Sequence, residues 1–169
     1  MNFKEYLVEV GNSMKKPAGL TIQSSKQTDL YSYKVEGLDF ITEINFTQRI
    51  HGTPDDRFVL EVDFYADSPA YRGMDRFNMT NLGKPLDVIS HTLWCIDDYL
   101  KKLDPKLNLI VLAFTGKQEE EGDTRRTDIY LKFVKRYLQS KNITDYKVNI
   151  RQGHKVHVKF ENIFAGDFR

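Results

Sequence analysis

Asn108-Leu109-Ile110-Val111-Leu112-Ala113-Phe114 is the stretch that decides the fold. It is almost wholly apolar, which is typical of a strand that is covered on both faces of its sheet. Helical patterns precede and follow it, and a strand–helix–strand unit with its usual right-handed crossover would place the stretch in mid-sheet. We therefore expect residues 108–114 to form a central strand.

The segment before this strand carries the clearest helical pattern in the chain. Pro85 suits a first helical turn, and Lys101 and Lys102 suit the negative end of the helix dipole. Between them, apolar residues repeat at intervals of three and four: Leu86, Ile89, Leu93, Ile96, Leu100 and Leu103. A second amphipathic helix is expected after the strand, from about Thr124 to Leu138.

Alternating apolar residues predict further strands on both sides of this unit. Long strands are expected over 38–50 and 58–64, joined by turn residues 51–56 into a hairpin with one face in water. A shorter alternation begins at Tyr31. A terminal hairpin is expected where residues 146–150 and 156–160 alternate around a Gln152-Gly153 turn.

These elements predict an α+β fold: a mixed, mostly antiparallel sheet with two main helices packed on one face, plus a short N-terminal helix. We expect residues 1–28 to hold that helix and a polar connection, residues 29–163 to form a single α+β domain, and residues 164–169 to be a tail. The N-terminal helix would either dock on a neighbouring molecule or pack on its own domain.

Composition narrows the class of protein. The 169 residues include 25 basic and 24 acidic ones, a net charge of +1, which argues against a dedicated non-specific binder of duplex DNA but leaves a local basic patch open. Cys95 is the single cysteine and fits a reducing compartment. There is no apolar run long enough to span a bilayer and no secretory signal at Met1–Tyr6, so cytoplasmic synthesis is expected.

Arg125 and Arg126 form the first candidate site, with Thr124 beside them. Two arginines at a helix start are electrostatically unfavourable, because the free amides there already carry positive partial charge. The same amides and guanidinium groups would suit a phosphate or a carboxylate. The alternative is that the acidic loop at 119–121 neutralises both arginines in surface ion pairs.

Asn81 and Gly83 precede the first long helix in a similar way. If both helices pack on one sheet face, their N-termini emerge near the same edge of the sheet, where ligands of open α/β sheets often bind. Asn81 and Gly83 would then join the arginines in one anion-binding site. The alternative is ordinary loop and capping chemistry.

The terminal hairpin is a candidate for nucleic-acid binding. Lys147, Arg151, Lys155 and Lys159 alternate with its apolar residues, and a two-stranded basic ribbon would suit phosphates. The alternative is that any half-exposed strand has this pattern, and that lysine at a sheet edge deters aggregation.

Catalytic and metal-binding patterns are incomplete. Asp87, His91 and Cys95 share a helical stripe, but they lie beside the core side of that helix, so we expect no metal and no cofactor. Glu61 and Asp63, with Asp55, suggest nuclease carboxylates, yet the usual acidic-x-lysine strand motif is absent from the sequence. Enzymatic activity is left open and is not the favoured interpretation.

Thr80-Asn81-Leu82-Gly83, then Val88, Thr92, Ile96 and Tyr99, and later Arg125-Arg126-Thr127-Asp128-Ile129-Tyr130, resembles a group of small proteins encoded by bacteriophages and bacteria. The resemblance spans about residues 76–136, and Ile129-Tyr130 stands where leucine–tyrosine is commoner. It implies an α+β fold and a phage or mobile-element setting, in the host cytoplasm or the virion. It carries over no catalytic role.

The function favoured by these observations is a non-enzymatic, phage-type assembly or accessory protein that acts through contacts with other proteins or by self-assembly. The alternative is a phosphate- or nucleic-acid-binding protein, a nuclease included, that uses the Arg125/Arg126 helix start. No membrane partner is expected.

Overall fold

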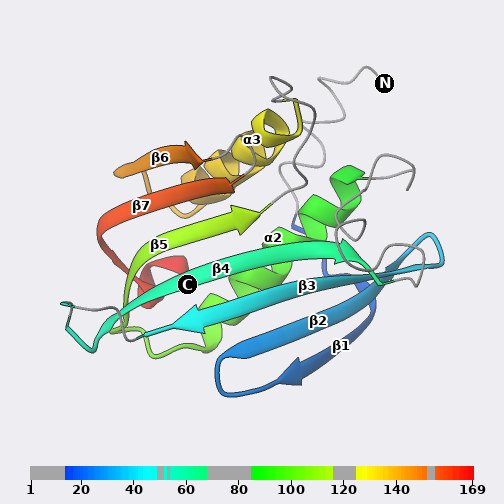
Figure 1. The fold of residues 1–169 in the computed structure, drawn as a ribbon, viewed down its shortest axis with the longest axis horizontal. Coiled ribbons are helices and arrows are strands. Elements are labelled where there is room, and N and C mark those ends of the chain that lie inside the picture. The colour runs from blue at the N-terminus through cyan, green and yellow to red at the C-terminus, as the bar shows by residue number, and fades with distance from the viewer. Residues whose placement is uncertain (1–13, 49–51, 53, 68–84, 116–124, 152–154) are drawn as a thin grey trace.

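A computed structural model describes residues 14–48, 52, 54–67, 85–115, 125–151 and 155–169. In these residues seven strands form one sheet (Figure 1): β1 (Ala18–Ser24), β2 (Thr28–Val35), β3 (Leu38–Thr47), β4 (Arg57–Ala66), β5 (Asn108–Thr115), β6 (Tyr146–Arg151) and β7 (Lys155–Phe164). The helices are α2 (Pro85–Lys102), α3 (Arg125–Ser140) and a short 3-10 helix, η3 (Ala165–Phe168).

The sheet is mixed and mostly antiparallel, as predicted. Its strands lie in the order β1-β2-β3-β4-β5-β7-β6. β4 and β5 are parallel neighbours, and every other neighbouring pair is antiparallel. The predicted mid-sheet place of residues 108–114 is confirmed, because β5 lies between β4 and β7.

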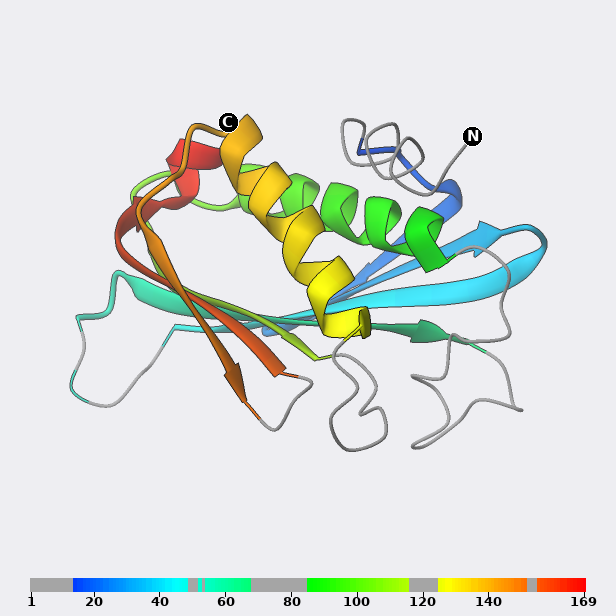
Figure 2. The same cartoon turned by 90° about the horizontal axis from the view of Figure 1, so that it is seen from above.

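Helices α2 and α3 both lie on the same side of the sheet, which confirms the predicted layering (Figure 2). The core fills the space between them and the sheet, with Ile96 and Leu100 of α2, Phe133 of α3, and Leu60 and Leu112 of the strands almost completely buried. The cover that we expected on both faces of β5 is supplied on one face only by the described elements.

Buried polar contacts fix α2 on the sheet. The hydroxyl of Tyr33 lies 2.9 Å from that of Thr42, which lies 3.1 Å from the hydroxyl of Thr92 on α2. At the edge of the core, Tyr31 donates a hydrogen bond to Asp98 of α2 at 3.0 Å. Since buried hydroxyls that lack a partner are costly, these contacts define how the helix sits as well as holding it.

The polar connection predicted over residues 12–28 is wrong for Ala18–Ser24, which form β1. β1 is an edge strand that pairs with β2, and its side chains are almost all exposed. The backbone ladder therefore holds it without an apolar face, so no alternation announces it. The N-terminal helix expected before it lies outside the described residues.

The tail predicted at residues 164–169 is also wrong. Ala165 and Phe168 of η3 are fully buried, and the ring of Phe168 stacks on Tyr137 with centroids 6.0 Å apart. The amide of Ala165 donates to the Leu107 carbonyl at 2.8 Å. A single helical turn is too short to show a hydrophobic period, which is why the segment looked irregular.

Candidate functional site

The sheet side opposite the helices carries a cationic face, which we define as Lys147 and Arg151 of β6 with Lys155 and Lys159 of β7. In the antiparallel register Lys147 is opposite Lys159, and Arg151 is opposite Lys155. Their neighbours along β7, such as Val158, are buried towards the helices, so the alternation of a strand turns the cations to the uncovered side. The structure thus brings all four predicted residues together.

Two further residues complete this face, and the nucleic-acid prediction did not include them. Asn149 and His157 are opposite each other between the two cation pairs. When the Asn149 amide is turned to match its neighbours, its oxygen accepts a hydrogen bond from Lys159 Nζ at 3.2 Å. The shared odd numbering of these positions was a signal that the sequence already offered.

His157 reports on the local field. Its partial burial, and then the charges of Arg151 and Lys159, lower its pKa below the ordinary value, and only Glu61 acts in the opposite direction. A histidine whose pKa is lowered by cationic neighbours lies in a region of positive potential. That potential favours an anion at this place.

The cations of this face have no carboxylate partner among the described residues. The described ion pairs lie elsewhere: Lys34 with Asp39 at one sheet edge, and the lysines around Asp97 and Asp98 of α2. Like charges placed directly opposite each other on neighbouring strands destabilise a sheet. The cationic face is therefore costly to the fold and available to a ligand.

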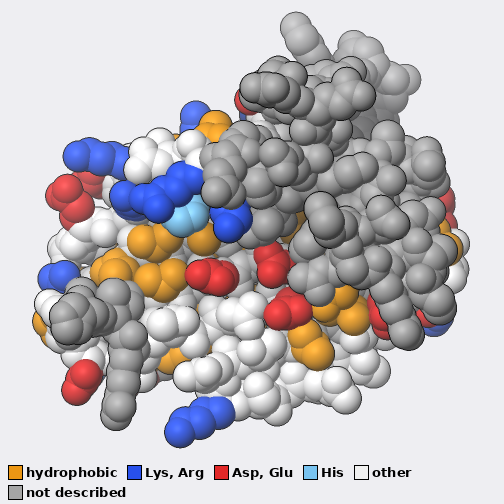
Figure 3. Space-filling view, viewed as in Figure 1, with side chains coloured by type: hydrophobic (Ala, Val, Ile, Leu, Met, Phe, Trp, Pro, Cys, Tyr) orange, Lys and Arg blue, Asp and Glu red, His pale blue; other side chains and the backbone are white. Residues whose placement is uncertain are grey.

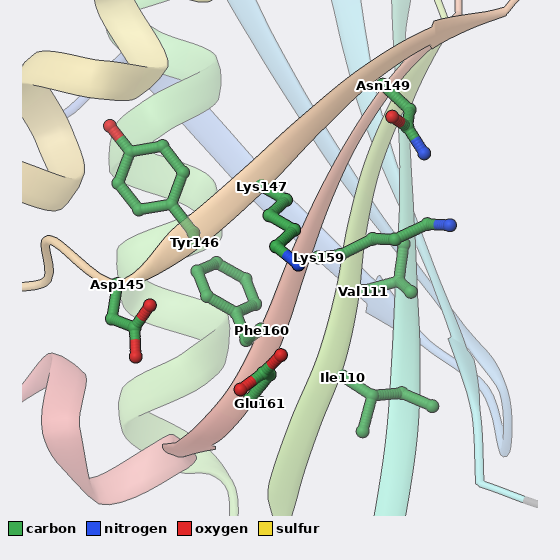
Figure 4. A pocket seen from close by; sticks show the side chains of 9 residues that line it. All are labelled: Ile110, Val111, Asp145, Tyr146, Lys147, Asn149, Lys159, Phe160 and Glu161. Atoms are coloured by element: carbon green, nitrogen blue, oxygen red, sulfur yellow. The ribbon is translucent and has the colours of Figure 1, made fainter.

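An open pocket of about 420 Å³ adjoins this face where β6, β7 and β5 meet. Figure 4 shows Lys147, Asn149 and Lys159 on one side of the hairpin, with Lys159 extending past Val111. Glu161 also lines the pocket, so its charge is mixed. The pocket is a shallow extension of the cationic face, and its lining holds no obvious catalytic pair.

An acidic half, which we define as Glu43 of β3 with Glu61 and Asp63 of β4, occupies the next part of the same uncovered surface. Glu43 is opposite Asp63 in the register. Tyr65 and Asn45 donate hydrogen bonds to Glu43 at 3.0 and 3.1 Å. In Figure 3 the Lys and Arg side chains gather around a histidine on one part of this surface, and acidic side chains gather on another, with apolar side chains between.

The nuclease interpretation gains no geometry from this acidic half. Asp55 lies in the turn before β4, whereas Glu61 and Asp63 lie well along that strand. Within the described ranges, no group of three or more His, Cys, Asp or Glu side chains is arranged to hold a metal ion.

The predicted anion site at the helix starts falls largely outside the described residues. Thr124, Asn81 and Gly83 are not described, and Arg125 and Arg126 open α3 with side chains that are not described. The backbone does place both helix starts after the carboxyl ends of the parallel strands β4 and β5. The predicted proximity of two helix starts therefore stays a prediction for the side chains.

His91 and Cys95 of α2 serve the interior. His91 Nδ1 lies 2.7 Å from the carbonyl oxygen of Lys15, and the imidazole packs edge-on against Tyr33. Cys95 is fully buried, and this burial raises the pKa of its thiol. A buried, protonated thiol is a structural residue.

Comparisons with known proteins add no assignment. No protein-family model, curated protein or solved structure matches this chain. Within the described ranges, no helix combines the length and apolar character that a membrane crossing requires.

Proposed function

We propose that this protein binds nucleic acid through the cationic face of the β6–β7 hairpin. The observation that carries the proposal is the pairing of Lys147 with Lys159 and of Arg151 with Lys155 on the uncovered side of the sheet. Each like-charge pair costs the fold roughly 0.2–1 kcal/mol compared with neutral neighbours. A phosphate between the two cations would replace this repulsion with two attractions.

The spacing of the cations suits a phosphate backbone. Residues two apart on a strand are separated by about 7 Å, so Lys147, Asn149 and Arg151 present polar groups at steps comparable with those between phosphates of an extended strand. Asn149 and His157 supply hydrogen-bonding groups between the charged pairs. Nucleic acid is therefore favoured over a single small anion.

The expected binding is weak and independent of base sequence. The cationic face carries no aromatic side chain on which a base would stack. Four phosphate contacts would give a slope of about −3 for log K against log salt with a single strand. The charge that matters is local, so the net charge of +1 does not oppose it.

Fluorescence anisotropy of a labelled single-stranded oligonucleotide, measured over a range of salt concentrations, tests this proposal. Lys155→Ala with Lys159→Ala should reduce the magnitude of the salt slope by about 2. Lys26→Ala with Lys106→Ala removes two exposed lysines elsewhere and should leave the slope unchanged. Equal affinity of the hairpin variant and the unaltered protein would contradict the proposal.

Two further arms separate the other anion-binding possibilities. If Arg125→Ala with Arg126→Ala abolishes binding while the hairpin variant still binds, the start of α3 is the site instead. If polyglutamate displaces the oligonucleotide at equal charge concentration, the ligand is a carboxylate-rich protein and not nucleic acid.

The second candidate is the phage-type assembly or accessory role, carried out through protein contacts. Apolar side chains on the uncovered side of the sheet favour it, since Val59 and Val111 are only partly buried there. A monomeric mass over a wide concentration range, with no co-purifying partner, would count against it.

A further inference from the structure

We propose that the uncovered sheet face binds a second copy of this chain, and that the resulting dimer hides the cationic face. The dimer stands on charge complementarity within this one surface. Only the second clause, that dimer and nucleic acid compete, rests on the proposed function.

Opposite charges lie in the same row across the sheet. Arg151 of β6 pairs with Lys155 of β7, Lys155 with Thr115 of β5, Thr115 with Asp63 of β4, and Asp63 with Glu43 of β3. Two cations therefore lie on one side of β5 and two carboxylates lie at matching positions on the other side. β5 is the dividing line between the two halves.

The neighbouring row repeats this arrangement. His157 of β7 pairs with Ala113 of β5, and Ala113 pairs with Glu61 of β4. His157 belongs to the cationic side and Glu61 to the acidic half. The next row has Val111 and Val59 on β5 and β4, so an apolar strip runs along the dividing line.

A two-fold axis that runs parallel to β5, above its uncovered face, makes this surface complementary to itself. The rotation lays β7 of one copy over β4 of the other, and β6 over β3, with each row in step. Lys155 then faces Asp63 of the other copy, and Arg151 faces its Glu43. A contact of this kind is isologous, because the same patch serves both copies.

Charge selects this orientation over its alternative. A two-fold axis perpendicular to the strands would lay β7 over β7 and bring cations onto cations. Stacked sheets pack about 10 Å apart with strands turned by about 30°, a misalignment that long Lys and Arg side chains can follow.

The composition of β5 supports the same conclusion independently. Strands that are apolar on both faces are characteristic of sheets that are covered on both faces. β5 reads as such a strand, yet the described helices cover only one of its faces. In the dimer, Val111 and Ala113 of the two copies would lie together on the axis and receive the missing cover.

The contact is expected to be weak. Five strands 4.8 Å apart and three rows about 7 Å apart give roughly 500 Å² per copy, or about 1,000 Å² in total, which is the lower end for a specific interface. Much of it is charged, so association should weaken as salt rises.

Complementary charge reversal gives the decisive test. Variant one carries Glu43→Lys and Asp63→Lys, and variant two carries Arg151→Glu and Lys155→Glu. In sedimentation velocity at low salt, the unaltered protein should dimerise as its concentration rises, and each variant alone should stay monomeric. A mixture of the two should form a heterodimer about tenfold tighter or more than the original dimer, because both charged zones are then uniformly opposite. This recovery also shows that both variants are folded.

An unaltered protein that stays monomeric at low salt, or variants that do not associate when mixed, would overturn the dimer. Competition is read from the same samples. The oligonucleotide should dissociate the unaltered dimer and bind variant one more tightly than the unaltered protein. Oligonucleotide binding without any dimer would remove this inference and leave the proposed function intact. A salt-sensitive dimer that does not bind oligonucleotide would do the reverse.

Discussion

Lys147 of β6 lies directly opposite Lys159 of β7 on the side of the sheet that no described helix covers. A folded chain gains nothing from this pair, since both side chains carry the same charge and no described carboxylate lies between them. Its persistence marks the hairpin as a surface shaped for an anionic partner, whether a phosphate backbone or the acidic half of a second copy.

Replacing Lys147 should therefore separate stability from binding. We expect Lys147→Glu to raise the free energy of unfolding by about 0.5–1 kcal/mol, since a like-charge pair becomes an opposite-charge pair. Nucleic-acid affinity should fall in the same variant. Urea denaturation and anisotropy measure the two effects. Lys26→Glu, at an exposed turn, carries the same charge change and should alter neither quantity. A loss of stability in Lys147→Glu would show that Lys147 supports the fold.

His157 should make stability depend on pH. Burial and the nearby Arg151 and Lys159 hold its pKa below the ordinary value, so the folded state favours the neutral ring. The unfolded chain titrates near pH 6.5. The contribution of His157 is therefore complete above about pH 6.5 and is lost as the pH falls through the lower folded pKa. Urea midpoints between pH 7.5 and 5 should fall less steeply in His157→Gln than in the unaltered protein, and equal slopes would contradict this.

Asp97 should be a main electrostatic support of the fold. It accepts a hydrogen bond from Tyr137 at 3.1 Å and pairs with Lys101 and Lys141 at 2.7 and 2.9 Å. Asp97→Asn leaves the largely buried Lys141 without its counter-charge and should cost about 3 kcal/mol. Asp55→Asn, at an exposed turn, is the control. A loss below 1 kcal/mol in denaturant titration would show that Lys141 finds another partner.

The pH dependence of the Asp97 contribution has the opposite sign to a cation's. Burial alone would raise the pKa of this carboxyl, but the bonds from Lys101 and Lys141 outweigh it and hold the pKa below 3.8. Its stabilisation is thus present above the unfolded pKa and is lost as the pH falls through the folded one. Acid unfolding of Asp97→Asn should lack this component.

The last residues of the chain should be needed for folding. Phe168→Ala empties a fully buried position against Tyr137 and should cost about 3–5 kcal/mol. Gly166→Ala should also destabilise, because a Cβ there would lie 2.9 Å from Pro105 Cβ and 3.2 Å from its carbonyl oxygen. Glu161→Ala, exposed on β7, serves as the matched control. Unchanged thermal midpoints in Phe168→Ala would mean that residues 164–169 are the tail that the sequence indicates.

The sequence by itself determined the elements whose signal is local. α2 follows from its spacing of apolar residues, the β3–β4 hairpin from alternation, and β5 from its uniform apolar character. It also determined that Lys147, Arg151, Lys155 and Lys159 share one side of a hairpin, because alternation along strands is a property of the backbone.

Tertiary structure decided the rest, because the remaining signals come from neighbours that are distant in sequence. β1 is a strand only because the backbone of β2 is there to pair with it, and η3 is ordered only because Tyr137 and Leu107 receive it. The same holds for the candidate site. β7 inserts between β5 and β6, and this strand order places the cationic face and the acidic half at equal distances from β5. No local pattern encodes that order, since it depends on which strand edges meet when the core closes.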